Sequence, residues 1–278
     1  MRWLLLALLL VVLAYALFAI GPPSLRAAYK RAVTARIAET VAMPPLTEAD
    51  LAPLPEPVRR YVRATGSVGQ PRVHHFEARW RGRIRSGPDD PWMTFHAKQV
   101  NVIGEPARIF FMDARRGGLP VDVLHAYEGG AARMRVRLLS LVPLVDEAGP
   151  ELDKTETVTV FNDMSILAPA ALVEPSISWE PIDDRSARGS YTVGSHTVSA
   201  TLHFNDAGEL VDFVSDDRSR ANADGSLEQV RWSTPVGDYR AFGERRVATR
   251  GEGRWHPPDG AYAYIELELE ALETNGTP

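Results

Sequence analysis

The stretch that decides the fold is His196–Asp216, with the sequence HTVSATLHFNDAGELVDFVSD. Its first half alternates strictly between apolar and polar residues, and the apolar positions are Val198, Ala200, Leu202 and Phe204. Such alternation is typical of a strand that has one face covered and the other in water. The run Asn-Asp-Ala-Gly after it can form a turn, because glycine tolerates a positive φ. The stretch therefore predicts an antiparallel β-hairpin.

The same kind of pattern extends over most of the chain outward from this hairpin. From residue 74 onward, short runs rich in Val, Phe, Trp and Tyr alternate with turn-forming clusters, which is the signature of a β-rich domain. Long strands joined by sequential hairpins favour one strongly curved antiparallel sheet, a half-barrel that is open or nearly closed. The fold class is therefore mostly β (α+β). The expected strands are 75–85, 92–103, 107–114, 121–127, 133–139, 177–181, 188–193, 196–204, 210–216, 227–235, 244–254 and 261–269.

One segment between the two sets of strands is expected to be helical. A break at Gly149-Pro150 precedes Asp153 and Glu156, whose spacing fits a helix-capping box with Asp153 as N-cap. An apolar stripe then continues at helical spacing, while the β-branched residues 155 and 157–159 favour a strand instead. An inserted helix needs a surface to pack on, and the concave face of the sheet is the natural one. The stripe consists of Val160, Phe161, Met164, Leu167 and Ala168.

The N-terminus carries an unbroken apolar run, residues 3–20. As a helix this run is roughly 27 Å long at about 1.5 Å per residue, which nearly spans a hydrocarbon core of about 30 Å. A cleaved signal peptide is the alternative, with Ala14-Tyr15-Ala16 as its cleavage triplet. Because the run continues past that triplet to Ile20, we expect an uncleaved single-pass transmembrane anchor.

The side of the membrane on which the rest of the chain lies is harder to predict. Four basic residues come after the apolar run, and the positive-inside rule would keep the large domain in the cytoplasm. A short N-terminal tail with a single Arg2 commonly stays inside, and the chain beyond the span is then exported, so we lean slightly to an extracytoplasmic domain. The basic residues 24–43 are expected to form a helix, either resting on anionic headgroups or serving as a solvated spacer. The expected division is 1–21 anchor, 22–66 basic linker helix and short helices, and 67–278 β-domain.

Composition excludes several classes of protein. With 45% hydrophobic and 24% charged residues, the 278-residue chain is globular rather than disordered. A net charge of −5 gives no reason to expect a nucleic-acid partner. The absence of cysteine excludes disulfides, thiolate nucleophiles and cysteine-bound metals. No hydrolase elbow, phosphate-binding loop, zinc-protease or dinucleotide motif occurs. The sequence therefore predicts no catalytic residue, metal or cofactor.

The most informative polar residues lie on the expected helix. Glu156 and Asp163 are seven residues apart, which places them at nearly the same azimuth and about 10.5 Å apart along the axis. This exceeds the roughly 5–9.5 Å of a glycosidase acid pair, so paired-carboxylate chemistry is not expected. Asp163 borders the buried stripe and needs a donor, for which Arg218 is the first candidate, whereas Asn162 points away from the stripe. Late aromatic residues are either core residues or the lining of an apolar cavity: Trp232, Tyr239, Phe242, Trp255, Tyr262 and Tyr264.

A resemblance to a known family is carried by six separate blocks of the sequence: 156–164, 168–172, 215–218, 231–235, 238–240 and 255–264. In this order they resemble a bacterial family of membrane-anchored proteins that is known only as a domain of unknown function. The resemblance covers roughly residues 45 to 272 and implies a β-domain similar to the carriers LolA and LolB, in which helices plug the apolar concavity of a half-barrel. It supplies no activity and no catalytic residues. Unlike LolB, this chain lacks a lipobox cysteine, so anchoring falls to the N-terminal helix.

Three functions are consistent with these features. The favoured one is a membrane-tethered binding module that holds a lipid or another apolar small molecule in the half-barrel, with residues 3–20 as its contact with the membrane. The alternatives are a scaffold that recruits a partner without a small ligand, and a hydrolase using Glu156, Asp163 or a histidine. The candidate residues, for ligand binding or for a structural latch, are Glu156, Asn162, Asp163, Arg218, Trp232 and Tyr239.

Overall fold

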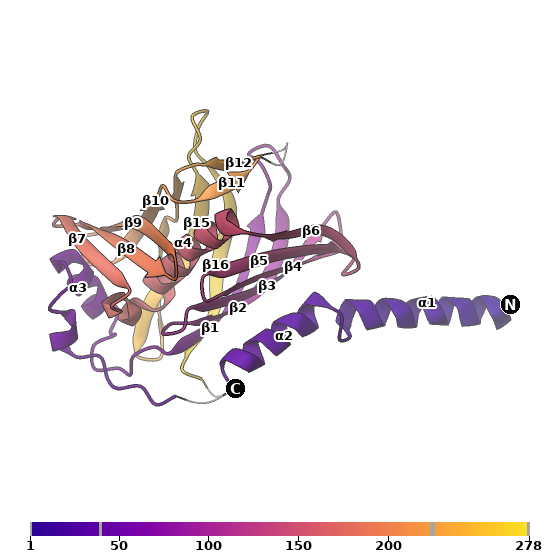
Figure 1. The fold of residues 1–278 in the computed structure, drawn as a ribbon, viewed down its shortest axis with the longest axis horizontal. Helices are drawn as coiled ribbons and strands as arrows, with labels where there is room; N and C mark the ends of the chain where they lie inside the picture. Colours follow the sequence, from indigo (N-terminus) through magenta and orange to yellow (C-terminus); the bar gives the residue numbers. More distant parts are fainter. Residues whose placement is uncertain (1, 39–40, 223–225, 277–278) are drawn as a thin grey trace.

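A computed structural model of the chain describes residues 2–38, 41–222 and 226–276. Among these residues, fourteen strands form one antiparallel sheet in the order β6-β5-β4-β3-β2-β1-β16-β15-β13-β10-β9-β8-β7, with β14 paired to β15. The sheet is strongly curved and stays open between its two edge strands, β6 and β7 (Figure 1). The predicted open antiparallel half-barrel with an inserted helix is therefore confirmed.

Most strands are joined to the next as hairpins, as expected from the alternating pattern. Edge strand β6 was not predicted, because its residues are exposed and show no alternation of apolar and polar side chains; β11 and β14 were missed as well. The expected strand 227–235 is divided into β12 and β13. The strands are β1 His75–Ile84, β2 Met93–Val102, β3 Ala107–Arg116, β4 Leu119–Glu128, β5 Ala131–Leu138, β6 Val142–Ala148, β7 Ile177–Asp183, β8 Ser186–Val193, β9 His196–Phe204, β10 Leu210–Ser215, β11 Ser219–Ala221, β12 Leu227–Gln229, β13 Trp232–Ser233, β14 Val236–Phe242, β15 Arg245–Trp255 and β16 Tyr262–Thr274.

The hairpin formed by β9 and β10 has the predicted one-sided burial. All four apolar positions of β9 are buried, whereas Thr197 and His203 on the opposite face are exposed. Gly208 closes the turn with a φ of +79°, a conformation that costs glycine little. The apolar side of the hairpin belongs to the main hydrophobic core and packs against α4.

Helix α4, Pro150–Leu167, connects the two edges of the sheet and crosses its concave side (Figure 1). The predicted capping box is wrong, because the helix begins at Pro150 after Gly149, and proline is favoured at the first helical position. The carboxylate of Asp153 instead accepts a hydrogen bond of 2.6 Å from the backbone N–H of Ala132 in β5. The strand alternative is wrong too. Thr157 Oγ1 donates to the carbonyl oxygen of Asp153 at 2.8 Å, which binds this hydroxyl within the helix.

Helix α1, Arg2–Ile20, extends away from the sheet and is exposed along nearly its whole length (Figure 1). Within the described residues, the helical stretch that begins with α1 is the one that is long and apolar enough to cross a membrane. The helical run breaks at Gly21-Pro22-Pro23 and resumes as α2, Leu25–Arg36. Ser24 caps α2 by accepting the backbone N–H of Ala27 at 3.0 Å.

The convex face of the sheet is covered by α2 over β3 and β4. Leu25 is buried with Ile109, Phe111 and Leu124, whose side chains point outward from the two strands. Arg26 Nη2 lies 3.0 Å from the Asp113 carboxylate of β3. The spacer alternative is therefore wrong, because the apolar side of α2 has an apolar partner on the sheet.

Short helices close one end of the concave side. These are η1 Glu48–Leu51, α3 Glu56–Ala64 and η2 Pro169–Val173. On α3, Val58, Tyr61 and Val62 form the buried face and are fully buried. The hydroxyl of Tyr61 donates to the carbonyl oxygen of Ser165 in α4 at 2.7 Å, which ties α3 to the inserted helix.

Candidate functional site

A cavity of about 1270 Å³ lies on the concave side between the sheet and α4. Its walls come from β1–β6 and β14–β16, together with one side of α4 and the segment around β11–β13. Ligand pockets commonly measure about 300–1,000 Å³, so this space can hold a long molecule. Its apolar lining includes Trp80, Ile84, Met93, Phe110, Met112, Val121, Val123, Val136, Trp232, Trp255, Tyr262, Tyr264, Ile265 and Leu267.

Helix α4 presents different chemistry on its two sides. The predicted stripe is buried, and Phe161 lies in an aromatic cluster with Tyr191 and Phe213. Each residue turns the helix by about 100°, which places a second set of residues opposite this stripe. These residues face the cavity instead of solvent. They form a row of mostly polar side chains, consisting of Thr155, Glu156, Thr159, Asn162, Asp163 and Ile166. The side-chain amide of Asn162 donates to Oγ1 of Thr234, the residue that follows β13, at 2.5 Å.

Asp163 is held by donors from two neighbouring strands. Arg108 Nε of β3 lies 2.7 Å from Asp163 Oδ2. Gln99 and Asn101 of β2 donate their side-chain amides to the same oxygen at 2.6 and 3.2 Å. The expectation of an arginine partner is confirmed, but Arg218 is the wrong arginine. The reason is position: Ser219 N donates to Thr155 Oγ1 at 3.1 Å, so this segment lies at the other end of α4 from Asp163.

Glu156 is the centre of a second group of charges and is 3% exposed. Its Oε2 atom lies 3.4 Å from Arg108 Nη1 and 3.4 Å from His125 Nδ1. Its Oε1 atom lies 3.7 Å from Arg218 Nη2. Arg108 therefore bridges Asp163 and Glu156. With Gln99, Asn101, His125 and Arg218 they form one network of seven side chains from β2, β3, β4, α4 and the segment between β10 and β11.

Burial and neighbouring charges act in opposite directions in this network. Burial by itself raises the pKa of Glu156, but His125, Arg108 and Arg218 together hold that pKa well below its ordinary value. Burial raises the pKa of Asp163, against the opposing effect of Arg108 and Asn101. For Arg108, burial lowers the pKa, and the two carboxylates more than reverse that effect. The network therefore depends on pairing, because an unpaired buried charge is costly.

The remaining candidates separate into two places. The guanidinium of Arg218 lies over the ring of Trp232 at 4.2 Å and over that of Trp255 at 5.4 Å, and all three line the cavity. Tyr239 lies outside the cavity, where its hydroxyl donates to the carbonyl oxygen of Leu210 at 2.9 Å. Five of the six candidate residues therefore share the cavity: Glu156, Asn162, Asp163, Arg218 and Trp232.

Four polar members of the network were not among the sequence candidates. Gln99, Asn101, Arg108 and His125 all carry a signal that could have identified them. They occupy inward positions of strands whose other inward residues are apolar, such as Phe110 in the strand of Arg108. A polar residue that interrupts a period-two apolar face marks a buried polar contact.

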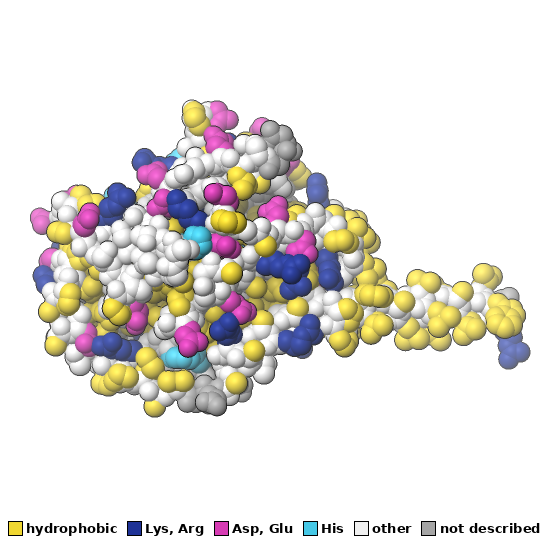
Figure 2. Space-filling view, viewed as in Figure 1, with side chains coloured by type: hydrophobic (Ala, Val, Ile, Leu, Met, Phe, Trp, Pro, Cys, Tyr) yellow, Lys and Arg dark blue, Asp and Glu magenta, His cyan; other side chains and the backbone are white. Residues whose placement is uncertain are grey.

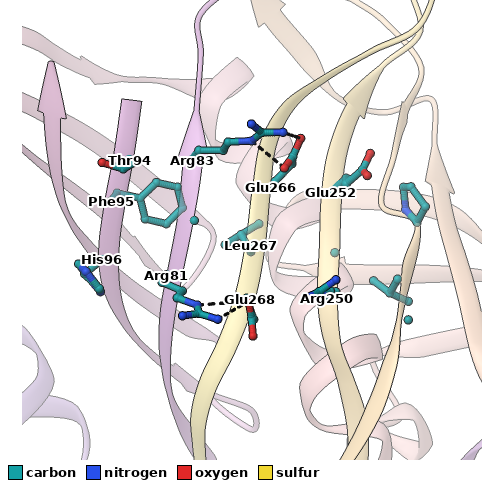
Figure 3. Close-up of a pocket in the computed structure, with 15 residues that line it drawn as sticks. Arg81, Arg83, Thr94, Phe95, His96, Arg250, Glu252, Glu266, Leu267 and Glu268 are labelled. Atoms are coloured by element: carbon teal, nitrogen blue, oxygen red, sulfur yellow. Dashed lines mark hydrogen bonds and ion pairs between the residues drawn. The ribbon is translucent and has the colours of Figure 1, made fainter. Parts of the chain in front are cut away.

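The convex face carries a second, shallower hollow of about 800 Å³ over β1, β2, β15 and β16 (Figure 3). Four of its charged residues pair on the surface, Arg81 with Glu268 and Arg83 with Glu266, each at 2.7 Å. Exposed pairs of this kind contribute little to stability. Among the described residues, no group of three or more His, Asp or Glu side chains is arranged to hold a metal ion. The concave cavity is therefore the candidate site.

Comparisons with known proteins give matches of two kinds. No curated protein matches the chain. Similar solved structures include a domain from Vibrio parahaemolyticus, provisionally described as an outer membrane lipoprotein-sorting protein domain, with 12% identity, a TM-score of 0.42 and coverage of 72% of this chain and 85% of that one. Another is a LolA superfamily protein from Nitrosomonas europaea, with 12% identity, a TM-score of 0.43 and coverage of 78% and 93%. A DUF1329 family protein from Desulfovibrio piger matches with 11% identity, a TM-score of 0.41 and coverage of 73% and 86%.

The family match covers most of the chain. Residues 44–267 match a family described as a family of unknown function (DUF6544). This range contains the whole inserted helix and the strands that wall the cavity as far as Leu267. The chain therefore belongs to this family of unknown function, as its sequence blocks predicted.

Proposed function

We propose that this protein is a membrane-tethered binding module that holds a lipid or another long apolar molecule in its concave cavity. The observation that carries the proposal is the cavity itself, whose volume of about 1270 Å³ lies against a mainly apolar wall. A concave, mainly apolar hollow of this size that is open on one side is typical of a site for a small molecule. An apolar ligand would bury the wall that the inserted helix leaves uncovered.

The apolar surface near the anchor supports a position of the cavity close to the bilayer. Leu119 at the start of β4, Leu141 in the turn between β5 and β6, and Leu144 in β6 are exposed. The turn between β5 and β6 lies at the end of the domain nearest to α1 (Figure 1). Arg137 Nη1 donates to the carbonyl oxygen of Pro23 at 2.9 Å, which fixes this end next to the end of α1. Figure 2 shows apolar side chains gathering there. Leu144 also lines the cavity, so one exposed apolar side chain is shared by this end of the domain and the cavity wall.

The proposal is tested by lipid extraction from the full chain purified in a mild detergent. We expect mass spectrometry to find a bound lipid that Val123→Trp displaces, because Val123 lines the cavity and is only half-buried. Lys98→Trp is the matched control, since Lys98 is exposed on the outer face of β2. Lipids that surround α1 should be equal in all three proteins. Equal total lipid in wild type and Val123→Trp would contradict the proposal.

We also infer that the domain lies on the extracytoplasmic side, as the short N-terminal tail with its single Arg2 suggests. The chain has no cysteine, so one introduced cysteine reports on its side without background labelling. Ser195 lies in an exposed turn between β8 and β9, so Ser195→Cys places the thiol on the surface. In intact cells it should react with a membrane-impermeant maleimide, whereas labelling only after the cells are opened would place the domain in the cytoplasm.

A further inference from the structure

Two side chains in the wall of the cavity have hydrogen-bond donors without an acceptor. The side chain of Arg218 is 9% exposed, and its guanidinium donates no hydrogen bond to another described residue. Its nearest carboxylate oxygen, Glu156 Oε1, is 3.7 Å from Nη2, which is beyond hydrogen-bond distance. Within the described part of the chain, the indole N–H of Trp232 is likewise buried without a partner. Unpaired buried donors cost free energy, and natural structures rarely leave them.

The other buried arginine of the network shows what a paired guanidinium looks like in the same cavity. Arg108 contacts Asp163 at 2.7 Å and Glu156 at 3.4 Å. The two carboxylates are in turn well supplied, because Asp163 accepts from three side chains and Glu156 faces three cationic or protonatable ones. The acids of the network are therefore occupied, and the unused groups at Arg218 and Trp232 are all donors. The complement of such a site is an acceptor.

The surroundings of Arg218 indicate what carries that acceptor. Its guanidinium lies over two indole rings, and these rings belong to the wall that continues to Tyr264 and Phe110. A flat cation held on aromatic rings keeps its edge free for a planar or tetrahedral oxyanion. A ligand with one polar end at Arg218 can therefore lay an apolar chain along the rest of the cavity.

We propose that Arg218 and Trp232 bind the oxyanion headgroup, carboxylate or phosphate, of an amphiphile whose apolar chain fills the cavity. This inference rests on the proposed function and names the chemical class of its ligand. Charge-assisted hydrogen bonds from arginine to carboxylate or phosphate are among the strongest in proteins. Glu156 stays paired with Arg108 and His125, so the headgroup takes the donors of Arg218 that Glu156 does not reach.

The test compares three probes on the full chain in nanodiscs of neutral lipid, with empty nanodiscs subtracted. The probes are palmitate, the uncharged hexadecanol of equal chain length, and inorganic phosphate. We expect palmitate to bind more tightly than hexadecanol. Arg218→Gln should lower the affinity for palmitate by about tenfold or more, because a charge-assisted contact is lost. The affinity for hexadecanol should change by less than about twofold. Arg231→Gln is the matched control, because Arg231 pairs with Asp216 on the surface and does not line the cavity.

Each other outcome overturns a defined part of the inference. If Arg218→Gln leaves palmitate binding unchanged, the headgroup assignment fails while the cavity still binds apolar chains. If Arg218→Gln lowers the affinities for palmitate and hexadecanol equally, Arg218 shapes the cavity and does not bind the headgroup. If inorganic phosphate binds as tightly as palmitate, the site takes a free oxyanion and no amphiphile. If neither chain binds wild type saturably, the proposed function itself fails. Arg218→Lys keeps the charge and should retain part of the palmitate preference, which provides a second variant should Arg218→Gln not fold.

Discussion

The two sides of α4 show how one inserted helix can fill half of a concave sheet and leave the other half open. On the side of β7–β10, Phe161 is fully buried and its ring lies 5.3 Å from that of Phe213 and 5.6 Å from that of Tyr191. On the side of β1–β5, residues such as Val123 and Ile166 are only half-buried and line the cavity. The packed side therefore contributes stability, and the open side is available for a ligand.

The difference arises from the residues that α4 turns toward each side. Aromatic and aliphatic side chains on one face interdigitate with the sheet, where dispersion and burial act together. The other face carries carboxylates, an amide and threonines, and polar groups of this kind are satisfied by a few fixed partners instead of close packing. A helix that lies within the concave side of the sheet and is polar on one face thus marks the boundary between core and cavity.

The largest expected effect separates the two sides directly. Phe161→Ala should lower the free energy of unfolding by about 3–5 kcal/mol, because it removes a fully packed ring. Ile166→Ala, on the cavity face of the same helix, should cost only about 1 kcal/mol, since its neighbours leave room already. Urea denaturation of the two variants measures both values. Equal losses would mean that the cavity side is as tightly packed as the core side.

The charged network should contribute stability on the cavity side in a way that depends on pH. Glu156→Gln should cost about 2–4 kcal/mol near neutral pH, because it leaves Arg108 and Arg218 with less compensation. The folded-state pKa of Glu156 lies below its ordinary value of 4.5, so its contribution is complete above that pH and is lost as the pH falls through the lowered pKa. The stability difference between wild type and Glu156→Gln should therefore shrink on acidification. A difference that is constant from pH 7 to pH 3 would contradict this account.

The sequence predicted the packed side better than the open side, and the reason is physical. Alternation in β9 and the stripe around Phe161 depend on local periodicity, which a single segment displays completely. The partner of Asp163 depends on which strands lie opposite α4, and this is a property of the whole sheet order. Arg218 was therefore expected where Arg108 lies, although both side chains belong to the same network.

The packing of α2 on the sheet was underestimated for a related reason. The outward residues of β3, such as Ile109 and Phe111, make the strand apolar on both faces. Such a strand must be covered on both sides, but the sequence does not state that α2 is the element that covers it. The short edge strand β6 was missed because an exposed strand lacks the alternation that marks one-sided burial.

A glycine on the packed side offers a smaller and more local test. Gly189 of β8 lies so close to α4 that a Cβ atom there would be 2.6 Å from Phe161 Cζ. Gly189→Ala should therefore cost about 1–3 kcal/mol through overpacking. Gly237→Ala is the matched control, because a Cβ atom at that strand position meets no atom within 4 Å. A thermal melt of both variants should show a shift only for Gly189→Ala, and an unchanged melt there would indicate slack around Phe161.

The smallest expected effect comes from adding one methylene group on each side. Val123→Ile extends into the cavity and should leave the free energy of unfolding within about 0.5 kcal/mol of wild type, since the added group meets open space. Val198→Ile makes the same chemical change in β9, where Val198 is fully buried in the core, and should cost about 1–3 kcal/mol. Lipid bound to each purified variant adds a second readout. Only Val123→Ile should alter which lipid chain lengths are retained, because it alone narrows the cavity. A similar loss of stability in both variants would show that the open side has no spare volume.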